Sequence, residues 1–474
     1  MRLTGWPGTE AGRPWLFFGR EAVLVSATVV VVGASLLATL GYAPTAPWAA
    51  FIPLGLVLLG IAAWIVAQAF AGSPAAIIAY LAIVVFLTDG QFRVRTAGEI
   101  DTDRQSLLKF VVWAGAGVIG AGHMPPLDKL LGRTGPACWL AYIAVALTSC
   151  LYSPVPGYSL GCAFALLCLF AFSFAVTARI SETQLLWTLS LTLTAFCLVG
   201  WVVFYTYPAL GTSVAWTYSG IYYRMCGIAG QSNNLGTVCI KDVGAVFLLW
   251  HAGRCRLLPA LLLGGIGTVT LLASDTRTGM IAIVVGVAAV ILSRSRWMVA
   301  GGAVAVLALY IASLTLPHVL DSLGSHFSRS GDPSELYTLT GRLEIWDFVW
   351  RKILEQPWLG WGYNSSKTIL GQNYGFSNGL MVDSAHNMYL QNLLSVGFIG
   401  MLPMVGLLIW MGVRFLTRPV SIVTYFLVTI LVSSVSDTDA LGTTPTVMTL
   451  VFMLISIWPE PARPYRLQTA AALA

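Results

Sequence analysis

Residues 158–177 read YSLGCAFALLCLFAFSFAVT and contain no charged side chain. A run of roughly 20 mainly apolar residues is what an α-helix needs to cross the hydrocarbon core of a bilayer. Its apolar residues are continuous rather than alternating with period two, which argues against the strands of a membrane barrel. Composition extends this conclusion to the whole chain, because 57% of its 474 residues are hydrophobic and only 10% are charged. We therefore expect an all-α, polytopic bundle of transmembrane helices rather than a soluble protein.

The same length criterion identifies fourteen candidate spans along the chain. They are residues 21–41, 48–70, 74–88, 107–122, 136–152, 158–177, 184–206, 235–250, 257–273, 279–293, 297–316, 388–413, 419–436 and 445–458. Several are short, so we expect about 12 to 14 transmembrane helices. We divide the chain into N-terminal spans (1–204), a core (205–415) with a long external loop (317–387), and C-terminal spans with a tail (416–474).

Basic residues predict the orientation of the spans, since short cytoplasmic loops are enriched in lysine and arginine. Arginine pairs fall at every second boundary, so both termini are expected in the cytoplasm; the pairs are Arg254 and Arg256, Arg294 and Arg296, Arg414 and Arg418, and Arg463 and Arg466. The loop 89–107 is an exception, because it holds three arginines yet is expected outside. The first apolar run exceeds the h-region of a signal peptide, so we expect an uncleaved first span.

Several function classes find no support in the sequence. The eight cysteines include no C-x-x-C pair and lie mostly within spans, so we expect neither a metal site nor a disulfide framework. There is no phosphate-loop motif and no internal repeat, and a repeat would have favoured a secondary transporter. The formal charge of +6 is ordinary for basic cytoplasmic loops and predicts no nucleic-acid partner.

The external loop is about 70 residues long, and loops of that length usually have a purpose. Its middle predicts an amphipathic helix that Thr340 caps and Pro357 ends, followed by a turn at residues 360–362. The apolar stripe of this helix comprises Leu343, Trp346, Val349, Trp350 and Ile353. We expect it to lie in the membrane interface, either as a packing cap on the bundle or as a lid over a lipid-linked substrate.

His386 comes just before the span 388–413, so we expect it at the outer mouth of a helix near the lipid headgroups. A histidine at that place is able to be neutral at physiological pH and to take a proton from a hydroxyl group. The alternative is a histidine that only forms hydrogen bonds at the interface, which is the commoner use of an isolated imidazole.

Arg224 and Arg277 are both expected outside, where the rule for loop charges does not call for arginine. A guanidinium is always charged, and its forked donors match phosphate oxygens. Two of them at one membrane face are suited to hold a diphosphate and to neutralise its charge as it leaves. The alternative is pairing with a nearby acid, and for Lys241 we favour this alternative and predict a compensating pair with Asp242.

Five motifs follow one another in an order that is specific, although each motif alone is weak. They are Arg224…Gly227…Asn234, Ser274–Gly279, Thr340–Trp346, Pro357–Gly362 and His386-Asn387. Together they resemble the O-antigen ligase and polysaccharide polymerase superfamily over roughly residues 205–415. Residues 232–234 read Ser-Asn-Asn and depart from the His-Lys-Asn that is common in the exopolysaccharide polymerases of this superfamily.

The resemblance implies an integral-membrane glycosyltransferase of the GT-C type in the bacterial inner membrane. Such an enzyme takes a glycan from undecaprenyl diphosphate at the periplasmic face, needs no cofactor, nucleotide sugar or metal, and inverts the anomeric carbon. A ligase passes the glycan to lipid A-core, whereas a polymerase passes it to the next repeat unit. The essential residues of the family map onto Arg224, Arg277 and His386; substrate-binding residues expected around them are Asn234, Lys241, Arg342, Tyr389 and Gln391.

Two interpretations from other classes compete with this one. A flippase for lipid-linked oligosaccharides would capture the headgroup with external arginines and perform no chemistry. Such a transporter predicts broken helices at mid-membrane and internal symmetry, and the sequence has no evident symmetry. A membrane scaffold of a polysaccharide-export complex is the third interpretation. Glycan transfer by the purified protein separates the enzyme from both.

Overall fold

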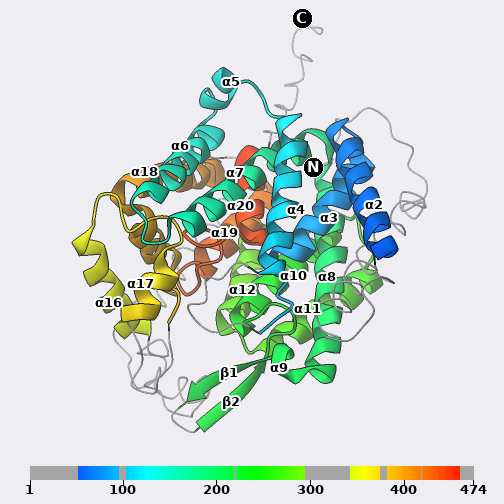
Figure 1. Ribbon diagram of the computed structural model, residues 1–474. Coiled ribbons are helices and arrows are strands. Elements are labelled where there is room, and N and C mark those ends of the chain that lie inside the picture. Colours follow the sequence, from blue (N-terminus) through cyan, green and yellow to red (C-terminus); the bar gives the residue numbers. More distant parts are fainter. Residues whose placement is uncertain are drawn as a thin grey trace, which may run out of the picture.

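The structure is a computed structural model that describes residues 52–94, 103–217, 220–293, 342–373, 382–417 and 419–458. Helices form most of the described chain (Figure 1). In the N-terminal half they are α2 (Ile52–Phe70), α3 (Pro74–Asp89), α4 (Arg104–Ala121), α5 (Leu127–Leu131), α6 (Thr134–Thr148), the 3₁₀ turn η2 (Ser149–Leu151), α7 (Pro156–Arg179), α8 (Glu182–Thr206) and α9 (Pro208–Gly211). In the C-terminal half they are α10 (Ser232–His251), α11 (Leu257–Ser274), α12 (Arg277–Leu292), α16 (Arg342–Glu355), α17 (Ser366–Asn373), α18 (Met388–Thr417), α19 (Ser421–Ser433) and α20 (Val447–Ile457).

The helices confirm the predicted fold class, an all-α multi-pass membrane protein. Twelve of the fourteen predicted spans coincide with a helix of the structure, and the other two, 21–41 and 297–316, lie outside the described residues. Five helices of the described part are long and apolar enough to cross a membrane: Thr134–Leu151, Pro156–Arg179, Glu182–Thr206, Leu257–Ser274 and Met388–Thr417. Several of the remaining spans are shorter apolar helices.

One end of the bundle collects polar loops, and we call it the polar end. The carboxyl ends of α3, α6, α8, α11 and α19 meet there with the amino ends of α4, α7, α10, α12, α18 and α20. For example, the Asp89 carboxylate at the end of α3 accepts a hydrogen bond of 2.9 Å from the backbone N–H of Val447, the first residue of α20. Polar backbone at such a place is satisfied inside the protein rather than by lipid.

Arginines lie at the opposite end of the bundle. The guanidinium of Arg133 donates a hydrogen bond of 2.7 Å to the carbonyl of Ile457, and that of Arg414 donates one of 3.3 Å to Trp458. Arg179 packs against Gly72 in the turn between α2 and α3. Cations at helix carboxyl ends satisfy carbonyl groups that have no partner within the helix. Basic residues were predicted at every second span boundary, and these arginines accordingly lie at one end of the bundle.

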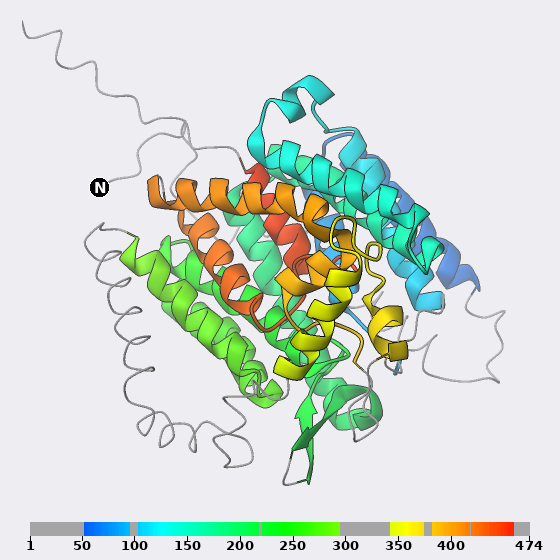
Figure 2. The ribbon, with the colours of Figure 1, turned by 90° about the vertical axis from the view of Figure 1, so that its left-hand side faces the viewer.

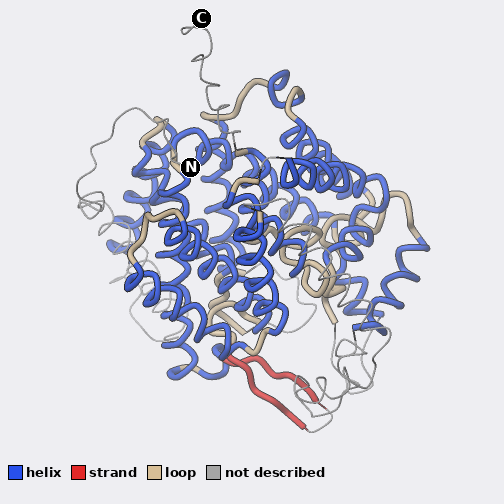
Figure 3. The backbone as a smooth tube through the Cα atoms, turned by 180° about the vertical axis from the view of Figure 1, so that it is seen from behind, coloured by secondary structure: helices blue, strands red, loops and turns tan. Residues whose placement is uncertain are grey.

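A β-hairpin interrupts the helices between α9 and α10. Strand β1 (Thr212–Thr217) pairs antiparallel with β2 (Gly220–Met225), and Arg224 lies opposite Ser213. Figure 3 shows the hairpin extending from the helical bundle at the polar end. We expected no strand here from the sequence, although β-branched and aromatic residues are typical of strands. The hairpin is an addition to the predicted fold, and it carries one of the predicted site residues.

Helix α18 is broken at Gly397, where we expected one continuous span. The φ angle of Gly397 is +63°, and a Cβ atom on this residue would lie 2.4 Å from the carbonyl oxygen of Trp358. The loop 357–362 enters the break and pairs with its backbone. The hydrogen bonds are Phe398 N–H to the Pro357 carbonyl (2.8 Å), Ile399 N–H to Trp358 (3.1 Å), Trp361 N–H to Leu394 (2.8 Å) and Gly362 N–H to Ser395 (2.9 Å). The motif 357–362, which was expected to form a turn, thus pairs with the backbone at the break in α18.

The predicted amphipathic helix of the external loop is confirmed as α16. It packs beside the amino-terminal part of α18 (Figures 1 and 2) and buries Ile345, Val349 and Ile353 in a small second core. Two residues of the predicted stripe, Leu343 and Trp350, are 46% and 43% exposed instead. The buried face agrees with a packing cap, and Thr340 lies outside the described residues.

Candidate functional site

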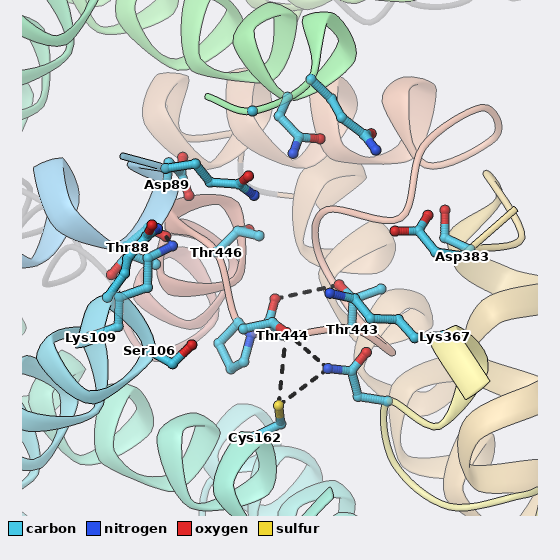
Figure 4. A pocket seen from close by; sticks show the side chains of 18 of the residues that line it. Thr88, Asp89, Ser106, Lys109, Cys162, Lys367, Asp383, Thr443, Thr444 and Thr446 are labelled. Carbon is cyan, nitrogen blue, oxygen red and sulfur yellow. Dashed lines mark hydrogen bonds between the residues drawn. The ribbon is translucent and has the colours of Figure 1, made fainter. Parts of the chain in front are cut away.

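A cavity of about 1110 Å³ opens at the polar end. Its walls come from the α3–α4 connection, the amino ends of α7 and α10, the start of β1, and the segments 364–367, 383–384 and 438–446. Figure 4 shows side chains from these elements pointing into one space. Segments from almost the whole chain therefore meet at a single polar chamber.

Arg224 is buried beside this chamber and holds the turn between α11 and α12. Its Nε donates a hydrogen bond of 2.9 Å to the carbonyl of Ser274, and its Nη2 donates one of 2.8 Å to the carbonyl of Asp275. The same Nη2 lies 3.3 Å from Thr276 Oγ1. Arg277 follows at once as the first residue of α12 and is half-buried. Arg224 thus fixes the backbone that presents Arg277.

The turn 434–438 connects the start of α12 with the start of α18. The Ser436 hydroxyl donates a hydrogen bond of 2.6 Å to Thr278 Oγ1, next to Arg277. The amide of Asn387 donates one of 3.1 Å to the Val435 carbonyl, next to His386. The structure therefore brings the regions of Arg224, Arg277 and His386 together at the polar end through an unbroken series of contacts.

His386 is held from both sides. The Trp346 indole of α16 donates a hydrogen bond of 3.0 Å to the Ala385 carbonyl, and the Ala385 N–H donates one of 2.9 Å to Gln391 Oε1. On the other side Asn387 caps α18, because its Oδ1 accepts from the backbone N–H groups of the first turn. The imidazole is thereby attached to a backbone that has little freedom.

The surroundings of His386 favour its neutral form. Burial is the main cause that lowers the pKa of its imidazole, and the positive charge of Arg342 lowers this pKa further, while Asp437 and Asp383 act in the opposite direction. Burial also raises the pKa of the Asp437 carboxyl. A neutral imidazole beside a carboxylic group is able to accept a proton.

Asp437 was missed by the sequence analysis. It lies in the segment Ser436-Asp437-Thr438-Asp439 between two apolar helices. The signal was available, because this segment places two acids between spans at the same face as His386, and ionisable groups in such places usually mark a site.

Left-handed backbone gathers around the same site. Among the described residues three non-glycine positions have a positive φ angle, namely Asp275 (46°), Asn364 (56°) and His386 (46°). Asp275 precedes Arg277 in the turn that Arg224 holds, and Asn364 lines the cavity. Such conformations are uncommon for L-residues and cluster where a surrounding structure enforces them for function.

The predicted pair of Lys241 with Asp242 is wrong. The Lys241 amine lies 2.8 Å from a carboxylate oxygen of Asp89 at the end of α3, whereas Asp242 accepts a hydrogen bond of 3.0 Å from Thr194. Lys241 is completely buried, so it connects α10 with α3 inside the bundle. Neighbouring helical residues point about 100° apart, which is why residues adjacent in sequence are poor partners on a helix.

The remaining predicted site residues are distributed between the cavity and the interior. Asn234 lines the cavity, and Arg342 and Tyr389 are half-buried near His386. Gln391 is completely buried; besides holding Ala385, its amide donates hydrogen bonds of 2.6 Å to Ser366 Oγ and 3.1 Å to the Gly442 carbonyl. In the described part of the chain no group of three or more histidine, cysteine, aspartate or glutamate side chains is arranged to hold a metal ion.

Comparison with known proteins shows what this chain is similar to. Residues 259–405 match the family model described as O-Antigen ligase, and this segment contains Arg277, Arg342 and His386. Over these residues the chain is similar to the O-antigen ligase family. It is also similar to an "O-antigen ligase" of Pseudomonas aeruginosa PAO1, with 31% identity over 188 residues, 36% of this chain and 38% of that protein. The match thus spans less than half of the relative, and Arg224 and Asp437 lie outside residues 259–405, the matched segment, which we call the ligase domain.

Proposed function

We propose that the protein is an integral-membrane glycosyltransferase. It transfers a glycan from undecaprenyl diphosphate to a hydroxyl group of a sugar acceptor at the periplasmic face of the bacterial inner membrane. The observation that carries the proposal is His386, pinned beside a large polar cavity and joined through the turn 434–438 to the arginine-bearing start of α12. The ligase domain supports the same reaction class.

The proposed chemistry divides between the two sides of the site. His386 removes the proton from the acceptor hydroxyl as its oxygen attacks the anomeric carbon. The bond between that carbon and the diphosphate oxygen breaks, the electron pair leaves with the diphosphate, and the configuration inverts. Arg277 and the amino end of α12 stabilise the charge that the leaving diphosphate gains. Arg224 acts by positioning the turn before Arg277.

Purified protein in detergent micelles tests this proposal. With a lipid-diphosphate-linked glycan and a sugar acceptor we expect product from the unmodified protein and none from His386→Ala, with both variants equally resistant to thermal unfolding. A flippase or a scaffold forms no product in micelles, so failure of the unmodified protein would favour those alternatives. Transfer by His386→Ala at a substantial rate would contradict the assignment of His386 as the general base.

Replacing Arg277 by lysine separates charge from geometry. We expect transfer to fall at least tenfold, because a point charge lacks the forked donors that match phosphate oxygens. Arg351→Lys on α16 is a suitable control, since Arg351 is an exposed residue paired with Asp347. Equal activity of Arg277→Lys and the unmodified protein would contradict direct binding of the diphosphate.

The break in α18 is the feature that the flippase alternative predicted. The backbone groups at the break form hydrogen bonds with the loop 357–362, so they are not available to a transported substrate, and we still favour the enzyme over the flippase.

Within the enzyme class, the glycans of a deletion strain distinguish the two reactions. Long lipid-linked chains without attachment indicate a ligase, and single repeat units indicate a polymerase.

A further inference from the structure

We propose that the cavity is the acceptor-binding chamber, and that Lys109 and Lys367 on its two walls select an acceptor glycan that carries negative charge. This inference rests on the proposed transfer reaction and adds the chemical class of its acceptor. The charged group is a phosphate ester or a uronic-acid carboxylate, since both present anionic oxygens to an amine.

The cavity lies on the acceptor side of His386. Asp383, Ser384 and Thr438 line it; the first two lie within three residues of His386, and Thr438 follows Asp437 directly in sequence. Neither Arg224 nor Arg277 is among the residues that line it. A general base has to reach the acceptor hydroxyl, whereas the diphosphate of the donor belongs at the arginines. The chamber next to His386 is therefore where the acceptor sugar fits.

Size and lining agree with a glycan. A volume of about 1110 Å³ exceeds the roughly 300–1,000 Å³ of typical small-molecule pockets. Hydroxyl and amide groups line its floor, where the Asn364 amide donates a hydrogen bond of 2.9 Å to Thr444 Oγ1 and the Tyr158 hydroxyl lies 3.2 Å from the same atom. Such groups are able to bond the hydroxyls of several sugar residues.

Two lysines lie on opposite sides of this floor. Figure 4 shows Lys109 of α4 on one wall, Lys367 of α17 with Asp383 on the opposite wall, and Thr443 and Thr444 between them. Lys109 is positioned by a hydrogen bond of 2.8 Å from its amine to the Thr88 carbonyl. Lys367 is positioned over the Tyr158 ring, 5.9 Å from the ring centroid. Both amines are half-buried, where a charge acts more strongly than in open water.

Three acids line the chamber, Asp89, Asp383 and Asp439, and Asp383 lies on the same wall as Lys367 (Figure 4). Asp89 is compensated by Lys241 at 2.8 Å. Burial and the nearby Asp437 raise the pKa of the Asp439 carboxyl well above its ordinary value, which favours its uncharged form. Arg93 of the same wall is paired with Asp103.

The residues proposed to select the acceptor come only partly from the ligase domain. That domain, residues 259–405, supplies Arg277 and His386 together with Lys367. Lys109, Tyr158 and Thr444 come from outside it. The helices before the domain, which the sequence analysis described only by hydropathy, thus contribute one wall of the acceptor chamber.

Binding of acceptors to the full-length protein tests the inference without catalysis. The probes are one oligosaccharide in three forms, namely neutral, phosphorylated and carrying a uronic acid. They are titrated by calorimetry into the His386→Ala variant in detergent micelles. We expect a charged form to bind at least tenfold tighter than the neutral form, and Lys109→Gln and Lys367→Gln each to remove about tenfold of that affinity.

The controls separate charge from folding. Lys352→Gln alters an amine on α16 that is paired with Glu355 outside the cavity, and it should leave all three affinities unchanged. The two lysine variants should keep the unfolding temperature of the parent. In turnover assays of the catalytically active protein they should raise the KM for the charged acceptor while kcat and the KM for the donor stay constant.

Each outcome decides. Preference for the phosphate form alone or for the uronic acid alone supports the inference and identifies the anion. Equal affinity for the charged and neutral forms overturns it, and so does an equal loss of all three affinities in the lysine variants. Transfer by His386→Ala together with charge-selective binding would overturn the proposed base but keep the chamber.

Discussion

His386, the proposed base, shows how neighbouring residues act on a single side chain. Arg342 lowers the pKa of its imidazole and Asp437 raises it. Its position was predictable, because a histidine at the mouth of a span is conspicuous among apolar residues. Its surroundings were not, since Arg342 and Asp437 are 44 and 51 residues away along the chain and meet it only in the folded protein.

The pH dependence of transfer follows from these two neighbours. The base must be neutral, so the rate falls when the pH drops below the pKa of His386. Arg342 lowers this pKa, so Arg342→Gln should move the acid limb to higher pH; Asp437 raises it, so Asp437→Asn should move the limb to lower pH. The measurement is the pH profile of kcat/KM for the purified variants. Limbs that move in the same direction would contradict the assignment of His386 as the titrating base.

A second prediction at this scale concerns the buried pair of Lys241 and Asp89. Their side chains are 0% and 7% exposed, so Asp89→Asn leaves a buried amine without its charge partner. We expect a loss of about 3 to 5 kcal/mol in the free energy of unfolding. Asp347→Asn is the control, because it breaks a pair that is 68% and 67% exposed and should cost at most about 1 kcal/mol. Thermal unfolding in detergent measures both, and equal losses would remove the structural role of Lys241.

Elements were predicted better than the backbone pairing between them. Apolar length identified the helices, since a bilayer imposes that length on every span. The hairpin 212–225 and the break in α18 were missed, because both depend on hydrogen bonds to partners that hydropathy does not reveal. The motif 357–362 was recognised, and its purpose became clear only once its backbone was found in the gap of α18.

Gly397 offers a direct test of that break. A Cβ atom there would meet the Trp358 carbonyl oxygen at 2.4 Å, and the φ angle of +63° disfavours any L-residue with a side chain. We expect Gly397→Ala to destabilise the protein by more than about 1 kcal/mol. Gly412→Ala in the same helix meets no atom within 4 Å and should be neutral or stabilising by up to about 1 kcal/mol. The unfolding temperatures of the two variants give the comparison, and a tolerated Gly397→Ala would mean that α18 is able to run straight.

At the scale of the whole molecule the two ends of the bundle differ in what their charges do. At the polar end, ionisable groups surround a cavity and the residues assigned to chemistry. At the other end, Arg133 and Arg414 hold helix carbonyls at the end of α20. Positive residues are enriched on the cytoplasmic side of membrane proteins. From this asymmetry we expect the polar end, and with it the proposed reaction, to face the periplasm.

Single cysteines at the two ends test this orientation. Tyr223 in the hairpin is 64% exposed, and Lys129 in α5 is exposed at the opposite end. In spheroplasts we expect Tyr223→Cys to react with a membrane-impermeant maleimide, and Lys129→Cys to react only after the membrane is permeabilised. The unmodified protein gives the background, because its eight cysteines are buried or half-buried. Labelling of Lys129→Cys alone in intact spheroplasts would show the opposite orientation. The site would then face the cytoplasm, where a periplasmic acceptor could not reach it.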